Sequence, residues 1–173
     1  MINFGVLTIS DKGSKGQRVD GSGPAIKDRI VLMGGRVVRY EIVPDEIDQI
    51  QKKLVEWADA GDVDVILSTG GTGLGPRDVT PEATLPILDK LVPGIAEAMR
   101  SETFAKTPVS ILSRAVSGVR KKCLIVNLPG SPKAVRECLE PVVPAIIHAV
   151  EMISGAVTEH NVQEREKGHT GKI

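Results

Sequence analysis

Short and almost wholly apolar segments alternate along this chain with longer segments of helical periodicity. The clearest apolar segments are Phe4–Ile9, Val63–Leu67 and Cys123–Leu128, and each has the length of a strand covered on both faces. Parallel strands need crossover connections, which helices naturally provide. The alternation therefore predicts an α/β fold, namely a three-layer α/β/α sandwich with a mostly parallel central sheet.

Proline, glycine and capping residues mark the expected helix ends. Pro24 stands where a first helical residue would, and Gly34-Gly35 supplies a C-terminal stop. Asp45 falls at the expected N-cap of a helix that runs through Trp57, and Thr80-Pro81 has the form of an N-cap followed by a proline at the first helical position. Further helices are expected from about Pro93 to Ala105 and up to about Ile153, whereas Ser110 to Gly118 has no clear pattern.

Length and charge restrict the organisation and the partners. The 173 residues fit one domain over residues 1–155, followed by a polar C-terminal tail at 156–173. Because 22 basic residues balance 22 acidic ones, no positive field favours a nucleic acid as partner. The apolar runs are far shorter than the roughly 20 residues of a membrane helix. The first residues also lack the basic region of a secretory signal, so a cytoplasmic protein is expected.

The two cysteines and the few aromatic residues exclude other kinds of site. Cys123 and Cys138 have neither CxxC spacing nor a nearby pair of histidines, so we expect two inert core thiols and no zinc site. Aromatic residues make up only 2% of the chain. A bound purine would therefore be held by backbone groups and aliphatic contacts, without an aromatic stacking platform.

The unusual residues of the chain gather in the loops that follow the predicted strands, where open α/β sheets bind ligands. In the central loop, Gly70, Gly71, Gly73 and Gly75 permit positive φ and close backbone approach, so that successive N–H groups can point at an anion. This pattern predicts a phosphate cradle, although a glycine-rich loop can also serve only to reverse the chain. No GxxxxGK[ST] motif occurs, and Pro76 or Arg77 occupies the place of a third dinucleotide-fingerprint glycine, so neither of those phosphate sites is favoured.

Two aspartates near these loops have two possible roles each. Asp78 and Asp45 offer carboxylates of the kind that holds Mg²⁺ against nucleotide phosphates, but either could simply cap the following helix. Arg77 and Lys133 could neutralise phosphate oxygens, and Ser131 lies near a helix start where the dipole favours anions. Taken singly, these last three would more often be solvated surface groups.

Five motifs in a fixed order resemble one family. They are Thr8-Ile9-Ser10-Asp11, Val43-Pro44-Asp45-Glu46, the Thr69–Gly73 loop with Arg77-Asp78-Val79-Thr80-Pro81-Glu82-Ala83-Thr84, Ile111-Leu112-Ser113-Arg114, and Asn127-Leu128-Pro129-Gly130-Ser131-Pro132-Lys133. Together they resemble the MogA and MoaB proteins and the similar gephyrin G domain, over about residues 3 to 153. The combination is far more specific than any one motif.

The resemblance implies an enzyme that converts molybdopterin and Mg-ATP to adenylylated molybdopterin and pyrophosphate. It implies that Asp45 and Asp78 are the catalytic, magnesium-linked acidic residues. With the loop positions it implies a substrate-binding set of Ser10, Asp11, Thr69, Gly70, Gly71, Thr72, Gly73, Arg77, Pro129, Gly130, Ser131 and Lys133. It also implies a homo-oligomer, a trimer or in some members a hexamer, and a separate protein that inserts molybdenum or tungsten.

Two alternatives remain open at the level of sequence. A protein of this fold could carry molybdopterin without catalysis, because a fold does not fix a function. A nucleotide pyrophosphatase of the competence-damage protein type would instead hydrolyse a diphosphate. The presence of both Asp45 and Asp78 favours the transferase over the carrier.

Overall fold

The computed structural model describes residues 1–156, and the predicted C-terminal tail lies, apart from its first residue, outside the described part of the chain. One six-stranded sheet forms the middle layer, in the order β2-β1-β3-β6-β5-β4. Its strands are β2 (Arg36–Val43), β1 (Asn3–Ile9), β3 (Val65–Thr69), β6 (Cys123–Leu128), β5 (Ser117–Arg120) and β4 (Lys90–Leu91). The first four are parallel, whereas β5 is antiparallel to both of its neighbours. The predicted three-layer, mostly parallel fold is confirmed.

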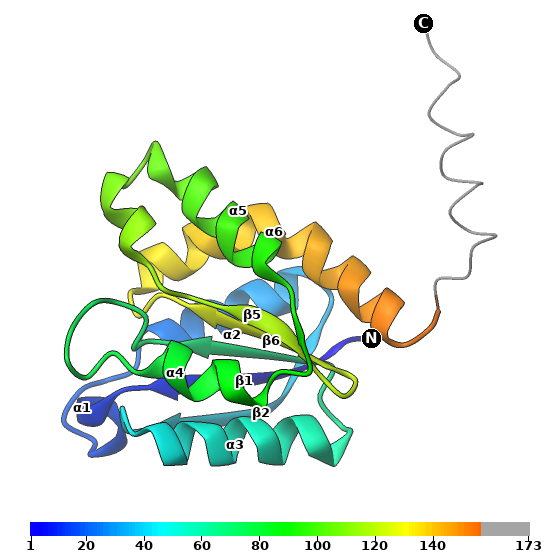
Figure 1. Ribbon diagram of the computed structural model, residues 1–173, viewed down its shortest axis with the longest axis horizontal. Coiled ribbons are helices and arrows are strands. Elements are labelled where there is room, and N and C mark those ends of the chain that lie inside the picture. The colour runs from blue at the N-terminus through cyan, green and yellow to red at the C-terminus, as the bar shows by residue number, and fades with distance from the viewer. Residues whose placement is uncertain (157–173) are drawn as a thin grey trace, which may run out of the picture.

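Helices cover both faces of this sheet (Figure 1). One face packs against α2 (Ser22–Leu32), α5 (Pro93–Phe104) and α6 (Pro132–Ile153), and the other against α3 (Ile47–Ala60) and α4 (Thr80–Thr84). A hydrophobic core lies on each face of the sheet, and alternate residues of the central strands pack into one or the other. Val65 and Leu67 lie on the face covered by α6, whereas Ile66 lies on the face covered by α3. This two-sided burial explains why β1, β3 and β6 are almost continuously apolar. Within residues 1–156, no helix is both long and apolar enough to cross a bilayer.

Several short elements differ from the sequence-based expectation. The loop expected from Lys12 to Gly23 contains the short helix α1 (Asp11–Ser14), and α2 begins two residues before Pro24. The unassigned Ser110–Gly118 stretch holds the end of a 3₁₀ helix, η2 (Pro108–Leu112), and the start of β5. A second 3₁₀ helix, η1 (Leu85–Ile87), follows α4 and leads to the two-residue strand β4, which was not predicted. These elements are too short to have a periodicity of their own.

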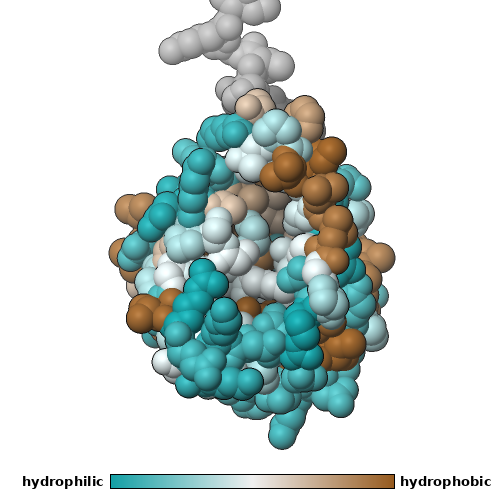
Figure 2. Space-filling view, turned by 90° about the vertical axis from the view of Figure 1, so that its left-hand side faces the viewer, coloured by the Kyte–Doolittle hydropathy of each residue, from teal (hydrophilic) through white to brown (hydrophobic). Residues whose placement is uncertain are grey.

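The carboxyl ends of β2, β1, β3 and β6 all point to one edge of the molecule, at the left of Figure 1. Figure 2 looks onto this edge and shows a hollowed centre with a largely hydrophilic rim on one side. The edge therefore brings together the loops after Ile9, Val43, Thr69 and Leu128, as the parallel sheet requires.

Candidate active site

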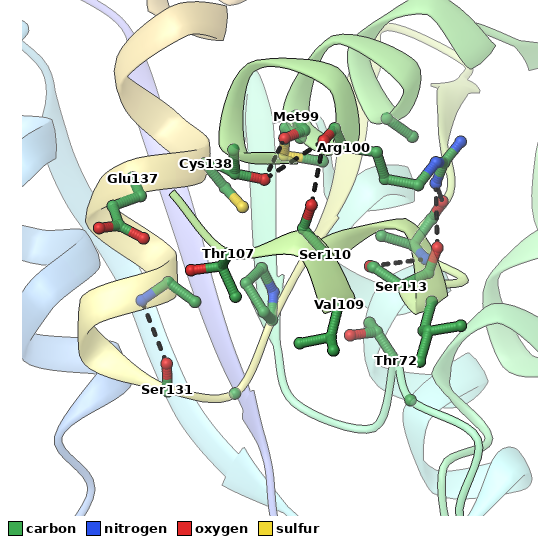
Figure 3. A pocket seen from close by; sticks show the side chains of 18 of the residues that line it. Thr72, Met99, Arg100, Thr107, Val109, Ser110, Ser113, Ser131, Glu137 and Cys138 are labelled. Carbon is green, nitrogen blue, oxygen red and sulfur yellow. Dashed lines mark hydrogen bonds between the residues drawn. The ribbon is translucent and has the colours of Figure 1, made fainter. Parts of the chain in front are cut away.

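Two cavities of about 440 Å³ each open at this edge and share part of their lining. The first, here called the α5 cavity, lies between the loop of residues 70–78, here called the glycine loop, and α5, η2 and the start of α6 (Figure 3). The second, here called the α2 cavity, lies between the glycine loop and the segment that leads into α2. Gly71, Gly130 and Ser131 line both, and we call these three residues the ridge. Ligands on the two sides of the ridge would therefore be neighbours.

Most of the predicted substrate-binding residues line one of the two cavities. Besides the ridge, the α2 cavity is lined by Ser10, Thr69, Gly70 and Asp45. The α5 cavity is lined by Thr72, Gly73, Pro129 and Asp78. The fold thus places one of the two predicted catalytic aspartates on each side of the ridge.

The glycine loop needs its glycines for two different reasons. Gly70 and Gly71 have φ of +103° and +63°, conformations that side chains disfavour. Gly73 and Gly75 do not have positive φ; there a Cβ atom would approach Asp78 Oδ2 to 2.8 and 2.9 Å. Gly70 and Gly71 therefore use the freedom of positive φ, whereas Gly73 and Gly75 leave room for the Asp78 carboxylate.

Asp78 does not cap α4. Its Oδ2 accepts a hydrogen bond of 2.8 Å from the Gly75 N–H, which folds the carboxylate back over its own loop. The N-cap of α4 is Val79, so Thr80 is the first helical residue and Pro81 the second. The sequence predicts Thr80 as the N-cap and Pro81 as the first helical residue. Thr80 instead donates its hydroxyl to the Gly70 carbonyl oxygen at 2.8 Å. The structure thereby removes the capping alternative for Asp78.

Asp45 is likewise not a helix cap. The N-cap of α3 is Glu46, and Asp45 Oδ2 accepts a hydrogen bond of 2.7 Å from the Asp11 N–H. In return, the Asp45 N–H donates to Asp11 Oδ1 at 3.1 Å. This reciprocal pair joins the ends of β1 and β2 and holds the Asp45 carboxylate at the mouth of the α2 cavity.

Ser131 is the predicted anion-binding residue that the structure places at a helix start. It is the N-cap of α6, and its hydroxyl accepts a hydrogen bond of 3.1 Å from the Ala134 N–H. As a ridge residue, it lines both cavities. The N-terminus of α6 therefore lies where a ligand in either cavity would be close to it.

Three other predicted substrate-binding residues, Asp11, Arg77 and Lys133, lie outside the linings of both cavities. Arg77 forms ion pairs with Asp11 at 3.0 Å and with Glu46 at 2.6 Å, and it thereby ties the glycine loop to α1 and to the start of α3. The Arg77 guanidinium lowers the pKa of Asp11. Lys133 is largely exposed and lies 3.9 Å from Glu137. The structure thus gives Arg77 two protein partners, and its predicted contact with phosphate stays a prediction.

The site predicted from the sequence does not include the residues on one side of each cavity. In the α2 cavity, Asp20 accepts hydrogen bonds from the hydroxyls of Thr8, Tyr40 and Ser22. Burial opposes ionisation of Asp20, but these bonds and one from the Gly23 N–H keep its pKa below the ordinary value. An aspartate before Gly21-Ser22-Gly23-Pro24 is a helix-start signal that could have identified it.

The missed wall of the α5 cavity is largely apolar and comes from three helical segments. Figure 3 shows Met99 and Arg100 of α5, Val109 of η2 and Cys138 of α6 around the space. No sequence signal marks this wall, because its residues are separated along the chain. Cys138, expected in the core, has 8% of its surface exposed here, and burial raises the pKa of its thiol. Cys123 is fully enclosed, and burial raises its pKa to about 12.

Electrostatic strain is concentrated at Asp45. Burial raises the pKa of this carboxyl, and the neighbouring charges of Asp11 and Asp78 raise it further, against the opposing effect of the Asp11 N–H and Arg77. Asp45 therefore has two carboxylates, those of Asp11 and Asp78, and one basic side chain, that of Arg77, as its charged neighbours. Such an arrangement favours a ligand that brings positive charge to the Asp45 side.

This strain predicts that Asp45→Asn stabilises the free protein. A carboxyl whose pKa is higher in the folded than in the unfolded state lowers the free energy of unfolding at pH values above the folded pKa. This loss disappears as the pH falls from the folded pKa to the unfolded pKa. Asparagine keeps an oxygen for the Asp11 N–H without the charge. In thermal denaturation without divalent cations, the variant should melt above the wild type at pH 7, and the difference should vanish at acidic pH. A lower melting temperature at pH 7 would contradict the strain.

Comparisons with known proteins agree with this arrangement. A family model described as "Probable molybdopterin binding domain" matches residues 5–148. A molybdopterin adenylyltransferase of Helicobacter pylori is 46% identical over 94% of this chain and 95% of its own length. Gephyrin of Dictyostelium discoideum is 44% identical over 87% of this chain, which corresponds to 22% of gephyrin.

Solved structures give the same result. The molybdopterin biosynthesis enzyme MoaB of Thermus thermophilus superposes with a TM-score of 0.85 at 51% identity, over 90% of this chain and 98% of that one. The family match covers most of the chain. The Helicobacter pylori relative matches over nearly its whole length, whereas in gephyrin the match covers one part of a longer protein. The chain therefore belongs to the molybdopterin-binding domain family that includes the MogA and MoaB proteins.

Proposed function

We propose that this protein is a molybdopterin adenylyltransferase that binds its two substrates on opposite sides of the ridge. The observation that carries the proposal is the pair of cavities that meet at Gly71, Gly130 and Ser131. A reaction between two phosphorylated substrates requires their phosphates to meet in line, and the ridge is the place common to both cavities. The names of the relatives supply the nature of the two substrates, molybdopterin and ATP.

The two aspartates on either side of the ridge fit a magnesium ion. Among residues 1–156, no three His, Cys, Asp or Glu side chains form a metal-binding group, so a fully protein-made cage is absent from the described chain. Mg²⁺ in nucleotide sites usually takes only one or two carboxylates and completes its coordination with phosphates and water. Asp45 and Asp78 are such a pair, because both carboxylates lie against the same loop, that of Asp45 at Gly71 and that of Asp78 at Gly73. Held there, the ion would neutralise charge on the reacting phosphates.

The chain's own groups align the reactants. The terminal phosphate of molybdopterin is ionised at neutral pH, so one of its oxygens attacks the α-phosphorus of ATP without a protein base. The bond from that phosphorus to the β-phosphate oxygen breaks, and pyrophosphate leaves. The bare backbone of Gly71 and Gly130 lets the phosphates approach, while the 22-residue helix α6, capped by Ser131, directs its N-terminus to the ridge. The protein's contribution is alignment and charge stabilisation.

The test is transfer of label from α-labelled ATP. We expect purified protein with molybdopterin and Mg²⁺ to form a labelled, adenylylated pterin and one pyrophosphate per transfer. No label should move when molybdopterin is left out. Binding of molybdopterin without transfer would instead support a carrier, and release of AMP from ATP without pterin would support a pyrophosphatase.

Three finer points belong to the same proposal. We expect a homo-oligomer, with a trimer favoured over a hexamer. The adenylylated product is expected to pass to a separate protein that inserts molybdenum or tungsten, as the resemblance to the MogA and MoaB proteins implies. The protein is expected to act in the cytoplasm.

A further inference from the structure

Arg114 lies behind the glycine loop and holds it at two points. Its Nε donates to the Gly73 carbonyl oxygen at 2.7 Å, and its terminal NH2 group donates to the Asp78 carbonyl oxygen at 2.5 Å. The same guanidinium forms an ion pair with Glu82 of α4. One rigid planar group therefore fixes both ends of the segment Gly73–Asp78 and anchors it to a helix.

The segment that carries Arg114 is itself held in place. The Arg114 N–H donates to the Thr72 carbonyl oxygen at 2.9 Å, which adds a backbone contact to the glycine loop. On the other side, Arg100 of α5 donates to the carbonyl oxygens of Ser113 and Ala115, each at 3.2 Å. Figure 3 shows Arg100 and Ser113 side by side at the cavity wall. The position of Arg114 is thus determined by α5 from one side and by the loop from the other.

This geometry holds the segment that carries the Asp78 carboxylate, together with the hydrogen bond of 3.0 Å from the Asp78 N–H to the Gly75 carbonyl oxygen. Within its loop, Asp78 Oδ2 accepts a hydrogen bond from the Gly75 N–H. Arg114 holds the carbonyl groups of Gly73 and of Asp78 itself, so it fixes the backbone on both sides of this hydrogen bond. If the carbonyl contacts were lost, the loop could rotate Asp78 away from the ridge. Leu112, Ser113 and Ala115 also line the α5 cavity, so the same arginine joins the wall of that cavity to Asp78.

We propose that Arg114 is a positioning residue that sets the Asp78 carboxylate for a phosphate-bound Mg²⁺ ion, with Glu82 orienting its guanidinium. The inference rests on the proposed function for the identity of that cation. Arg114 lines neither cavity, and it acts through Asp78 without touching substrate. A lysine cannot replace it, because one ammonium group does not reproduce the planar set of donors that reaches two carbonyls and a carboxylate.

The chain offers a matched control in Arg120. Its Nε and Nη2 donate to the Asp59 carboxylate, and its Nη1 donates to the Ile87 carbonyl oxygen at 3.0 Å. This is again one arginine between a carboxylate and the backbone, but it lies at the end of β5 opposite to the ridge. Arg120→Lys therefore reproduces the structural loss without affecting Asp78.

The experiment measures adenylyl transfer and Mg-ATP binding by calorimetry over a range of Mg²⁺ concentrations. Arg114→Lys should raise the half-saturating Mg²⁺ concentration about 10- to 100-fold, the usual effect of losing a residue that supports a metal ligand. Hydrogen exchange of the Gly75 amide should also become faster. Glu82→Gln should raise the half-saturating Mg²⁺ concentration by a smaller factor. If Arg114→Lys does not fold, the Mg²⁺ dependence of Glu82→Gln tests the positioning role in its place. Arg120→Lys should leave both measurements unchanged.

The outcomes separate this inference from the proposed function. Wild-type Mg²⁺ dependence in Arg114→Lys, or an equal shift in Arg120→Lys, would overturn the positioning role. If the wild type transfers no AMP, the proposed function fails, and Mg-ATP binding together with exchange at Gly75 still decides the role of Arg114. Faster exchange with unchanged Mg²⁺ affinity would make Arg114 a structural clamp only and would also overturn the inference.

Discussion

Replacing Asp78 with asparagine is expected to lower kcat/KM for adenylyl transfer by roughly 10²- to 10³-fold, because the metal-linked charge is lost from the reacting phosphates. The fold should survive. The asparagine Oδ1 can still accept the hydrogen bond from the Gly75 N–H, and the contact of Arg114 with residue 78 is made through the backbone. Steady-state transfer of label from ATP, together with a thermal melt, measures both effects in one preparation.

Asp28→Asn is the matched control for this variant. Asp28 is an exposed residue of α2, outside both cavity linings, and the substitution changes the net charge by the same amount. Transfer should be unaffected there. If Asp78→Asn turned over at the wild-type rate, the carboxylate would have no role beyond its bond to Gly75, and the assignment of the metal-binding pair would fail.

The sequence predicted those features that depend on neighbouring residues. Gly70 and Gly71 follow a buried strand directly, and the structure confirms their positive φ at the edge of the sheet. Their place beside Asp45 follows from the rule that parallel strands end at a common edge. For this reason the layers and the gathering of these loops at one edge were predicted from local patterns, whereas the division into two cavities was not.

The errors arise where a side chain bonds to a distant part of the chain. Asp45 and Thr80 both have the form of helix caps, but Asp45 bonds to Asp11, 34 residues away, and Thr80 bonds to the Gly70 carbonyl oxygen. Capping preference is a local tendency that tertiary contacts override. The role of Arg114 could not be predicted for the same reason, since its partner Gly73 lies 41 residues earlier in the chain.

Gly70→Ala is expected to be the most damaging addition of a single methyl group in the glycine loop. Its φ of +103° is strained for any residue with a side chain, and the new Cβ would lie 2.3 Å from the Ile9 carbonyl oxygen. That oxygen belongs to the backbone of β1, so it cannot move aside as a flexible side chain would. Strain of this kind costs at least about 2 kcal/mol. The melting temperature should therefore fall by about 4 to 8 °C in a chain of this length.

The same substitution should also abolish adenylyl transfer. The Gly70 N–H donates to the Leu128 carbonyl oxygen, and the Gly70 carbonyl accepts the Thr80 hydroxyl, so a shift at Gly70 moves the ends of β3 and β6 and the start of α4 together. Gly94→Ala is the control, because its added Cβ would have no atom within 4 Å outside its chain neighbours and its own helix backbone, and the residue is in the first turn of α5. Alanine favours a helix over glycine, so this variant should melt at or above the wild-type temperature. A Gly70→Ala protein that melted and turned over like Gly94→Ala would show that the loop relaxes freely and that its observed backbone conformation is not required for the reaction.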